Sequence, residues 1–457
     1  MESNRKPSFI ALAPLLIFLV MILGFGLALG SARAVDAMVL FMISAFISIF
    51  MYRDKPVMEK FDIFAKGAAN PNTMVMIMVF LLAGAFSAVA RDGGAVSSVV
   101  NLFLTFVPSN FLVPGMFLVA CLVATSLGTS VGTIVALTPV AVGVAESTGL
   151  PVAMVIGAVL GGAIFGDNMS VISDTTIAAT RLCGVKMTDK FKMNFLIVLP
   201  AAIITMIIFA VLTSGHNVEF TPGEYNLLQV LPFAVVLVTA LSGMNVFFVL
   251  LTGIVLAGGV GMYFNTFVTP EGYPQIIGLL QVIQKGMMGM SKVSIIVIIV
   301  GGIIGMMKYN GGVDWLVQKL QARVESKKGA MFSNALLTIL CTVFIANSTV
   351  SIITLAPIQM ETTNKFGVDP RRTASYLDIF ATAMMSNIPW GPPLLVAAAG
   401  ASAAMTTGSV DALELIKYST YSHLVMISAF ASIFFGLPNF KFLREEVREE
   451  VKLEKNN

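Results

Sequence analysis

Long apolar blocks, separated by short polar stretches, run through most of this 457-residue chain. Each block approaches the roughly 20 helical residues that cross a hydrocarbon core about 30 Å thick. Because lipid offers the backbone no hydrogen-bonding partner, we expect these blocks to be membrane-spanning helices. Full spans are predicted at residues 9–30, 34–52, 73–90, 194–213, 227–241, 244–263, 293–308 and 417–436.

Two further stretches, 111–180 and 331–403, are longer and more broken. Each contains an apolar run, a short polar tip, a second apolar run and a segment interrupted by Gly, Asn or Pro. Irregular backbone occurs at membrane depth only where protein buries it or where it borders a cavity. We therefore expect each stretch to form a re-entrant hairpin followed by a discontinuous spanning helix. The predicted fold is an all-α polytopic membrane protein with about ten transmembrane helices and two re-entrant hairpins.

The two broken stretches also match each other at a constant offset. Shifting the sequence by 218 residues pairs Gly84 with Gly302, Gly93–Gly94 with Gly311–Gly312, Ser130 with Ser348, Leu137 with Leu355, Pro139 with Pro357 and Gly149 with Gly367. After a slip of one residue, Asn168 pairs with Asn387. Two unrelated hydrophobic halves could match by coincidence, but an offset that holds this far along the chain favours an internal repeat.

Composition supports the membrane assignment, since 57% of the residues are hydrophobic and only 12% are charged. A soluble domain carries about 25% charged residues. The net charge of +3 is too small to indicate a nucleic-acid partner. The sequence contains no P-loop, so we expect no direct use of ATP, and neither an enzyme motif nor a cofactor site is predicted. The first apolar block exceeds the core of a signal peptide and is expected to be a retained helix.

The positions of the 28 Lys and Arg residues predict which loops face the cytoplasm. Most of them, Lys190 included, fall on one side of the predicted spans, together with both termini, and this side is expected to be cytoplasmic. The same assignment puts Gly93–Gly94 outside and the matching Gly311–Gly312 inside. The two halves are therefore predicted to be inverted-topology repeats, with a site near mid-membrane where their discontinuous helices meet.

This organisation divides the chain into five regions. We expect N-terminal scaffold helices at 1–72, the first inverted repeat at 73–213, linking scaffold helices at 214–290, the second inverted repeat at 291–436 and a charged cytoplasmic tail at 437–457. The transport chemistry is expected in the two repeats.

The break in the first repeat, from Gly166 to Thr176, places two carboxylates, an amide and several hydroxyls in an apolar stretch. A carboxylate in the membrane costs at least about 2.5–3.5 kcal/mol and commonly marks an ion or proton path. Burial favours the protonated form, so such a group can exchange a proton for a cation. Oxygen ligands without sulfur suit a hard cation such as Na⁺. The predicted cation and proton site comprises Asp167, Asn168, Ser173 and Asp174 with Thr129 and Ser130 of the hairpin tip, and Asp167, Asn168 and Asp174 are the expected Na⁺ ligands.

Several of these assignments have structural alternatives. Asp174 stands between Ser173 and two threonines, so it could instead cap the second half-helix. The second repeat is less charged and offers neutral oxygens, from Asn347, Ser348 and Thr349 at its hairpin tip and from Ser386 and Asn387 at its helix break. Prolines at this break remove backbone donors and leave carbonyls free. Asp378 precedes the break, and both a proton-carrying role and a structural role are open.

The run Gly166–Thr176, with the upstream run Ser126–Val140, resembles the NhaC-type sodium/proton antiporter family over most of the chain. The resemblance implies an antiporter of the bacterial inner membrane that exchanges Na⁺ for H⁺ by alternating access. That family also includes malate/lactate antiporters, so sodium-coupled transport of an organic anion or amino acid is an alternative, with the solute near Thr129, Asn347 and Asn387. A passive channel is a third, more distant one.

The tip Asn347–Thr349 also resembles the hairpin tips of the wider ion-transporter superfamily, whose members carry similar Ser-Asn-Thr sequences. This likeness implies a homodimer with a fixed scaffold and a moving transport domain. It also implies that both hairpin tips line the cation site. The expected partners are therefore the lipid bilayer, Na⁺ and H⁺, and a second copy of the chain, with Na⁺ as the transported or coupling ion.

Overall fold

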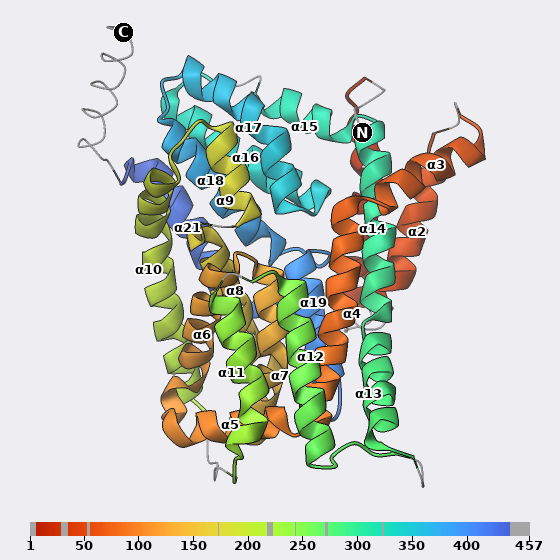
Figure 1. Ribbon diagram of the computed structural model, residues 1–457. Helices are drawn as coiled ribbons and strands as arrows, with labels where there is room; N and C mark the ends of the chain where they lie inside the picture. The colour runs from red at the N-terminus through yellow and green to blue at the C-terminus, as the bar shows by residue number, and fades with distance from the viewer. Residues whose placement is uncertain are drawn as a thin grey trace, which may run out of the picture.

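The computed structural model describes residues 6–28, 35–52, 55–171, 173–216, 223–242, 244–269, 273–321 and 324–438, where its regular elements are all helices (Figure 1). Eight stretches there are long and apolar enough to cross a membrane: Thr73–Asp92, Ser109–Leu127, Ser130–Thr148, Val152–Leu182, Met187–Ser214, Val246–Tyr263, Gln275–Tyr309 and Lys327–Ile345. The predicted all-α polytopic membrane fold is therefore confirmed. The total of ten spans stays a prediction, and the tail expected at 437–457 lies outside the described residues after Pro438.

One group of helices, called the outer group below, lies outside the two hairpins and the interrupted helices that they touch. Its members are η1 (Phe9–Leu12), α1 (Ala13–Ala28), α2 (Ala37–Phe50), α3 (Val57–Ala68), α4 (Pro71–Asp92), α5 (Ala95–Phe106), α11 (Leu227–Leu241), α12 (Val246–Tyr263), α13 (Gln275–Gly289), α14 (Ser291–Tyr309) and α15 (Gly312–Gln321). α4 packs against α12 and α13, and α14 packs against α2 and α3. Glycines allow the closest approach, since a Cβ on Gly84 would lie 2.2 Å from the carbonyl oxygen of Gly286.

Two helical hairpins occupy opposite halves of the molecule. The first, α6 (Leu112–Leu127) and α7 (Ser130–Thr148), lies in the lower half of Figure 1, and the second, α16 (Lys327–Ile345) and α17 (Ser348–Lys365), lies in the upper half. Gly128 takes a left-handed φ of 67° at the first tip, which glycine adopts without steric cost. Ala346 takes a φ of 48° at the second tip, where the Asn347 side chain accepts a hydrogen bond from the N–H of Val350 and caps α17.

Each hairpin is followed by an interrupted helix. In the first half, α8 (Val152–Met169) ends and α9 (Asp174–Leu182) begins; in the second, α18 (Pro370–Met385) ends and α19 (Pro392–Ala404) begins. Two prolines start α19, where their missing N–H groups would have no helical partner in any case. α7 packs against both α8 and α19, and α17 packs against both α9 and α18. Each hairpin therefore touches both interrupted helices, which brings the two breaks together.

The helices repeat at the offset seen in the sequence. Adding 218 to the bounds of α6, α7, α8 and α9 gives those of α16, α17, α18 and α19 to within a few residues. α4 and α5 correspond to α14 and α15 in the same way. This agreement supports the predicted repeat. The opposite membrane orientation of the two halves stays a prediction.

Some predicted boundaries are wrong, and one error bears on the site. α10 (Met187–Ser214) begins well before the predicted span 194–213 and carries Lys190 into the interior, whereas the charge pattern predicts Lys190 in a cytoplasmic loop. Helix also precedes the predicted span 293–308, since α13 runs directly into α14. The span predicted at 417–436 corresponds to α21 (Thr420–Phe435), which begins three residues later because the short helix α20 (Ala412–Lys417) ends just before it. Hydropathy misplaces the start of α10 because its polar residues find partners inside the protein.

Candidate functional site

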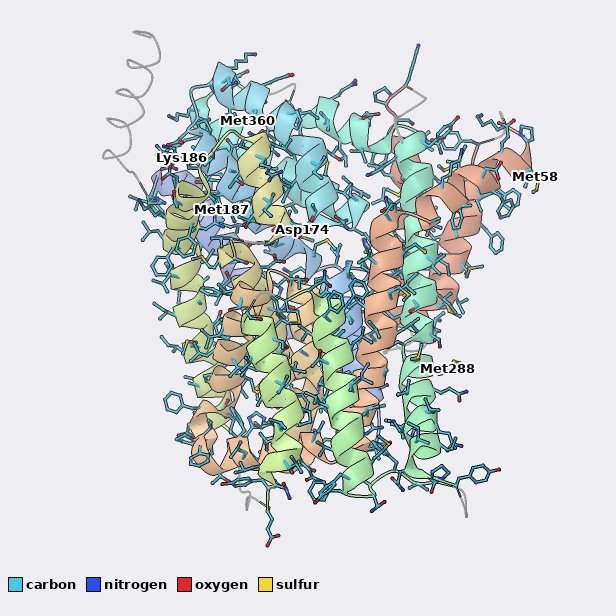
Figure 2. The ribbon with its side chains drawn as sticks, in the orientation of Figure 1. Met58, Asp174, Lys186, Met187, Met288 and Met360 are labelled. Atoms are coloured by element: carbon cyan, nitrogen blue, oxygen red, sulfur yellow. The ribbon has the colours of Figure 1, made fainter. Side chains whose placement is uncertain are left out.

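The hairpin tips and the interrupted helices border one cavity of about 120 Å³. Its lining includes Thr129 and Ser130 from the first tip, Asn347, Ser348 and Thr349 from the second, and Asp167 and Asp174 from the two ends of the first break. Thr382, Met385, Pro392 and Pro393 complete it from α18 and α19, and Met76, Val131 and Ile164 supply apolar walls. Figure 2 shows Asp174 near mid-height, between the upper and lower groups of helices. Sequence positions more than 200 residues apart thus meet at one place.

Asp167 is held by two hydroxyl groups. It lies in the last turn of α8 and is only 6% exposed. Ser130 donates to its Oδ2 at 2.9 Å, and Ser173 donates to its Oδ1 at 2.5 Å. Because Ser173 uses its proton on Asp167, the 2.8 Å contact between the Ser173 and Thr175 hydroxyls has Thr175 as the donor. The carboxylate therefore has a fixed orientation at the edge of the cavity.

The position of Asp167 depends on close helix packing. A Cβ on the neighbouring Gly166 would lie 2.3 Å from the Cβ of Ala124 and 2.5 Å from the backbone nitrogen of Thr125, both in α6. Only glycine permits this approach without a shift of backbone. The end of α8 therefore packs closely against α6 of the first hairpin, and this packing keeps Asp167 within hydrogen-bonding distance of Ser130 at the hairpin tip.

Asp174 links the first break to the second hairpin. It is the first residue of α9 and, unlike Asp167, is exposed. Its Oδ1 accepts from the N–H of Thr175 at 3.0 Å, as a residue at a helix start can do, and its Oδ2 accepts from the Thr349 hydroxyl at 2.5 Å. The N-cap position of α9 is Ser173, so Asp174 combines a contact with one N–H of the first turn and a place on the cavity.

Asn168 ties two helices, α10 and α18, to the end of α8. Its side-chain oxygen accepts from Thr382 of α18 at 2.6 Å. Its backbone oxygen, freed by the end of the helix, accepts from Lys190 at 3.1 Å and from Asn194 at 2.9 Å, both in α10. Asn168 is 1% exposed. Its contacts hold the break in place, and Asn168 is not among the residues that border the cavity.

Asp378 forms a buried ion pair with Lys190. The Lys190 Nζ lies 2.6 Å from the Asp378 Oδ2, and the two side chains are 1% and 0% exposed. Lys190 also donates to the Thr176 hydroxyl at 2.6 Å, and Asn194 donates to the same Asp378 oxygen at 3.0 Å. An ion pair this deep is costly to break by removal of one partner, because the other charge is left uncompensated. The Lys190 ammonium thus already balances the charge of Asp378.

Lys190, Asn194 and Thr382 were not among the predicted site residues. Lys190 and Asn194 are four residues apart and so lie on one face of α10, as do Asp378 and Thr382 on α18. A polar pair at this spacing inside an apolar helix is the signal that could have revealed them. The pairing of Lys190 with Asp378 joins residues 188 positions apart, and nothing local in the sequence specifies it.

The predicted residues of the second break lie away from the cavity. Ser386 is fully buried, donates to the backbone oxygen of Ala383 at 3.0 Å and contacts the Ser422 hydroxyl at 2.6 Å. Asn387 donates to the same Ala383 oxygen at 2.8 Å. Neither borders the cavity, whereas Pro392 and Pro393 do. The second half meets the cavity through its hairpin tip and through residues of α18 and α19 on either side of the break.

The donor set has a clear chemical character. Two carboxylates, several hydroxyls and an amide converge, and the described residues contain no cluster of three or more His, Cys, Asp or Glu side chains able to hold a metal ion. Hard alkali cations bind to such oxygens, whereas soft or transition metals favour sulfur and imidazole. The arrangement suits a monovalent cation that binds and leaves.

Comparison with known proteins bears on the whole chain. A family model described as "Na+/H+ antiporter family" matches residues 4–214 and 213–437. The chain belongs to this Na⁺/H⁺ antiporter family. It is 25% identical over 386 residues to the Na⁺/H⁺ antiporter NhaC of Alkalihalophilus pseudofirmus, covering 79% of this chain and 81% of that protein.

Two further similarities complete the comparison. The antiporter is 23% identical over 424 residues to the malate-2H⁺/Na⁺-lactate antiporter of Bacillus subtilis, covering 85% of this chain and 88% of the relative. Among solved structures, the YdaH transporter of Alcanivorax borkumensis matches with a TM-score of 0.38 and 16% identity, over 79% of this chain and 85% of that one.

Proposed function

We propose that this antiporter exchanges Na⁺ for H⁺ at the cavity between the hairpin tips, with Asp167 as the group that holds either ion. The observation that carries the proposal is the contrast between two buried carboxylates. Asp378 lies against the ammonium of Lys190, whereas no Lys, Arg or His nitrogen among the described residues lies within 4 Å of Asp167. A buried carboxylate without a counter-charge is neutralised by a proton or by a bound cation.

Exchange follows from this competition. When Asp167 is protonated, it loses a negative charge and one acceptor, so the cavity no longer favours Na⁺. When Na⁺ is bound, the proton must leave. The hydroxyls of Ser130 and Ser173 can turn a lone pair toward the cation, and Asp174 adds the second carboxylate. Because Na⁺ and H⁺ compete for the Asp167 carboxylate, the site carries only one of them each time it changes the side of the membrane that it faces. Movement of Na⁺ in one direction is thereby coupled to movement of H⁺ in the other.

Access to the cavity would alternate through the hairpin tips. The Thr349 hydroxyl donates a hydrogen bond to Asp174, so we expect the second hairpin to move relative to α9 when the cavity opens or closes toward the second hairpin. In the proposed arrangement the helices within 1–72 and 214–290 act as the scaffold of a homodimer in the bacterial inner membrane, with both termini cytoplasmic. The two hairpins and the interrupted helices form the moving part.

Proton flux in sealed proteoliposomes tests this function. A pH-sensitive dye inside the vesicles should report proton movement on addition of Na⁺ for the unchanged chain. Asp167→Asn should reduce the Na⁺-dependent rate at least 100-fold, because the amide can neither bind a proton nor supply charge. The matched control is Asp314→Asn on α15, which makes the same chemical change far along the chain from the site and should keep the rate. Flux in Asp167→Asn equal to that of the control would refute the assignment.

A second candidate is sodium-coupled transport of a small organic anion, which the name of the Bacillus subtilis relative supports. Of the three residues expected near such a solute, Thr129 and Asn347 border the cavity, while Asn387 does not. Thermal stabilisation of the purified protein distinguishes the two. Stabilisation by Na⁺ alone favours exchange of Na⁺ and H⁺, and stabilisation that needs Na⁺ with a carboxylate favours the second candidate.

A further inference from the structure

A second polar cavity adjoins the cation site on the side of the outer group. Its volume is about 200 Å³, and its walls come from α3, α4 and α14 on one side and from the second hairpin tip, Trp390 and Pro392 on the other. Figure 1 shows α16 and α17 on one side of this junction and α3 and α14 on the other. The two cavities share Met76, Asn347 and Pro392 as lining residues.

The charged side chains that line this second cavity, among the described residues, are both positive. Lys66 of α3 and Lys308 of α14 both line it, and none of its described lining residues is Asp or Glu. Neither lysine lies within 4 Å of a carboxylate among the described residues. The Lys308 side chain is only partly exposed, and burial of a charge without a partner is unfavourable. Lys292, on the same helix, shows the alternative, since it pairs with Asp36 at 2.5 Å.

Two helix N-termini add to the positive potential. α4 begins at Pro71, and Asn70, Pro71 and Thr73 all line the cavity. α17 begins at Ser348, next to the lining residue Asn347. The amino end of a helix carries a partial positive charge and attracts anions. Asn347 uses its side-chain oxygen to cap α17, which leaves its amide N–H groups to donate.

We propose that this cavity binds a compact anion through a carboxylate or phosphate group held by Lys308, Lys66 and Asn347. This goes beyond the exchange of Na⁺ and H⁺, and it does not require Asp167 to be the cation ligand. Cavities for drug-sized molecules measure about 300–1,000 Å³, so the space here suits a smaller ligand, such as a short dicarboxylate. The anion would sit between the outer group and the second hairpin. Its charge would favour a cation in the adjoining cavity, and by linkage the cation would favour the anion.

Such an anion has two sources, a free solute or the headgroup of an anionic lipid, and binding measurements separate them. The probes are succinate, with the uncharged succinamide as its control, and nanodiscs of phosphatidylcholine with and without phosphatidylglycerol. Binding to the purified chain is followed by calorimetry and by thermal unfolding. We expect succinate to bind and succinamide not to bind.

Substitutions assign the effect to this cavity. Lys308→Gln should weaken succinate binding at least tenfold, and Lys66→Gln on the more exposed lysine should weaken it in the same direction. Lys292→Gln removes the same charge from the same helix, outside the cavity, and should leave the affinity unchanged. Lys66→Gln keeps the test decisive where Lys308→Gln does not fold.

The outcomes separate the sources and decide the proposal. Succinate binding that Lys308→Gln weakens, and Lys292→Gln does not, supports a site for a free anion. Stabilisation by phosphatidylglycerol alone, lost in Lys308→Gln, supports the same site with a lipid headgroup as its ligand. No response to either probe, or an equal response in Lys308→Gln and Lys292→Gln, overturns the proposal. These readouts involve no Na⁺ or proton flux, so their failure is distinct from failure of the proposed exchange.

Discussion

The two interrupted helices occupy matching places in the chain, but the side chains at the first break are acidic and those at the second are neutral. At the first break, Asp167 and Asp174 stand at the two ends, and both carboxylates border the cavity. At the second, Ser386 and Asn387 both donate hydrogen bonds to the backbone oxygen of Ala383, and no charged side chain occupies the break. The two halves therefore share a backbone arrangement, and the acidic side chains at the first break are the reason we propose that half as the main source of cation ligands.

The two breaks are also stabilised differently. The first depends on α10, whose Lys190 and Asn194 bind the freed carbonyl of Asn168. The second is closed by its own neighbours, since Gly391 lies tightly against Met385 and Trp390 donates to the backbone oxygen of Val343 at 2.9 Å. A break held by charged groups can respond to charge at the adjacent site. A break held by packing acts as a rigid frame.

The largest effect should come from removing the charge that supports the first break. Lys190→Met leaves Asp378 buried without its counter-charge, which typically costs about 3–5 kcal/mol. We expect a large fall in the thermal unfolding temperature in detergent. Lys192→Met, on an exposed neighbour in the same helix, is the control and should change it little.

The paired variant Lys190→Met with Asp378→Leu sharpens this test. Removal of both charges should restore much of the lost stability, because apolar replacements of a buried ion pair are often tolerated. A single Lys190→Met variant as stable as its control would show that the ion pair does not support the break.

A smaller effect should distinguish the packed break from the acidic one. In Gly391→Ala the new Cβ would lie 1.8 Å from the backbone oxygen of Met385, and in Gly166→Ala it would lie 2.3 Å from the Cβ of Ala124. Overpacking costs about 1–3 kcal/mol, so both variants should lose stability. Gly166→Ala should also weaken Na⁺ binding, since it displaces Asp167, whereas Gly391→Ala should not.

Calorimetry of Na⁺ binding to the folded fraction, beside unfolding scans, checks this pair of substitutions. Gly259→Ala in α12 is the control, because its Cβ would meet nothing within 4 Å. Equal Na⁺ affinities in Gly166→Ala and Gly391→Ala would remove the functional distinction between the breaks.

The smallest effect concerns the exposed carboxylate of the acidic break. Asp174→Asn should lower Na⁺ affinity about tenfold, equivalent to about 1.4 kcal/mol, while its amide oxygen can still accept from the Thr175 N–H. Thr349→Val, which removes the hydroxyl that donates to Asp174, should change the affinity less. If Asp174→Asn binds Na⁺ as the unchanged chain does, Asp174 has only a local structural role at the start of α9.

The sequence predicts the local parts of this architecture and misses the distant pairings. Gly128 and Pro392 mark the first tip and the second break because glycine permits a left-handed φ, whereas proline fixes φ and lacks an N–H. Asp167 stands out because a carboxylate in an apolar stretch needs a function. By contrast, Lys190 has the hydropathy of a loop residue, and only the packing of α10 against α18 reveals its partner Asp378. The second cavity was equally out of reach, since α14 and the second hairpin tip meet there only in three dimensions.

The most direct test of the central claim is proton release during Na⁺ binding at equilibrium. Purified protein in weak buffer is titrated with Na⁺ while a pH indicator follows the solution. Since Asp167 would hold either ion, binding should acidify the solution, and Na⁺ affinity should fall as the pH is lowered. Asp167→Asn should bind Na⁺ weakly and release no protons. Release of protons by Asp167→Asn equal to that of the unchanged chain would show that another group carries the exchanged proton.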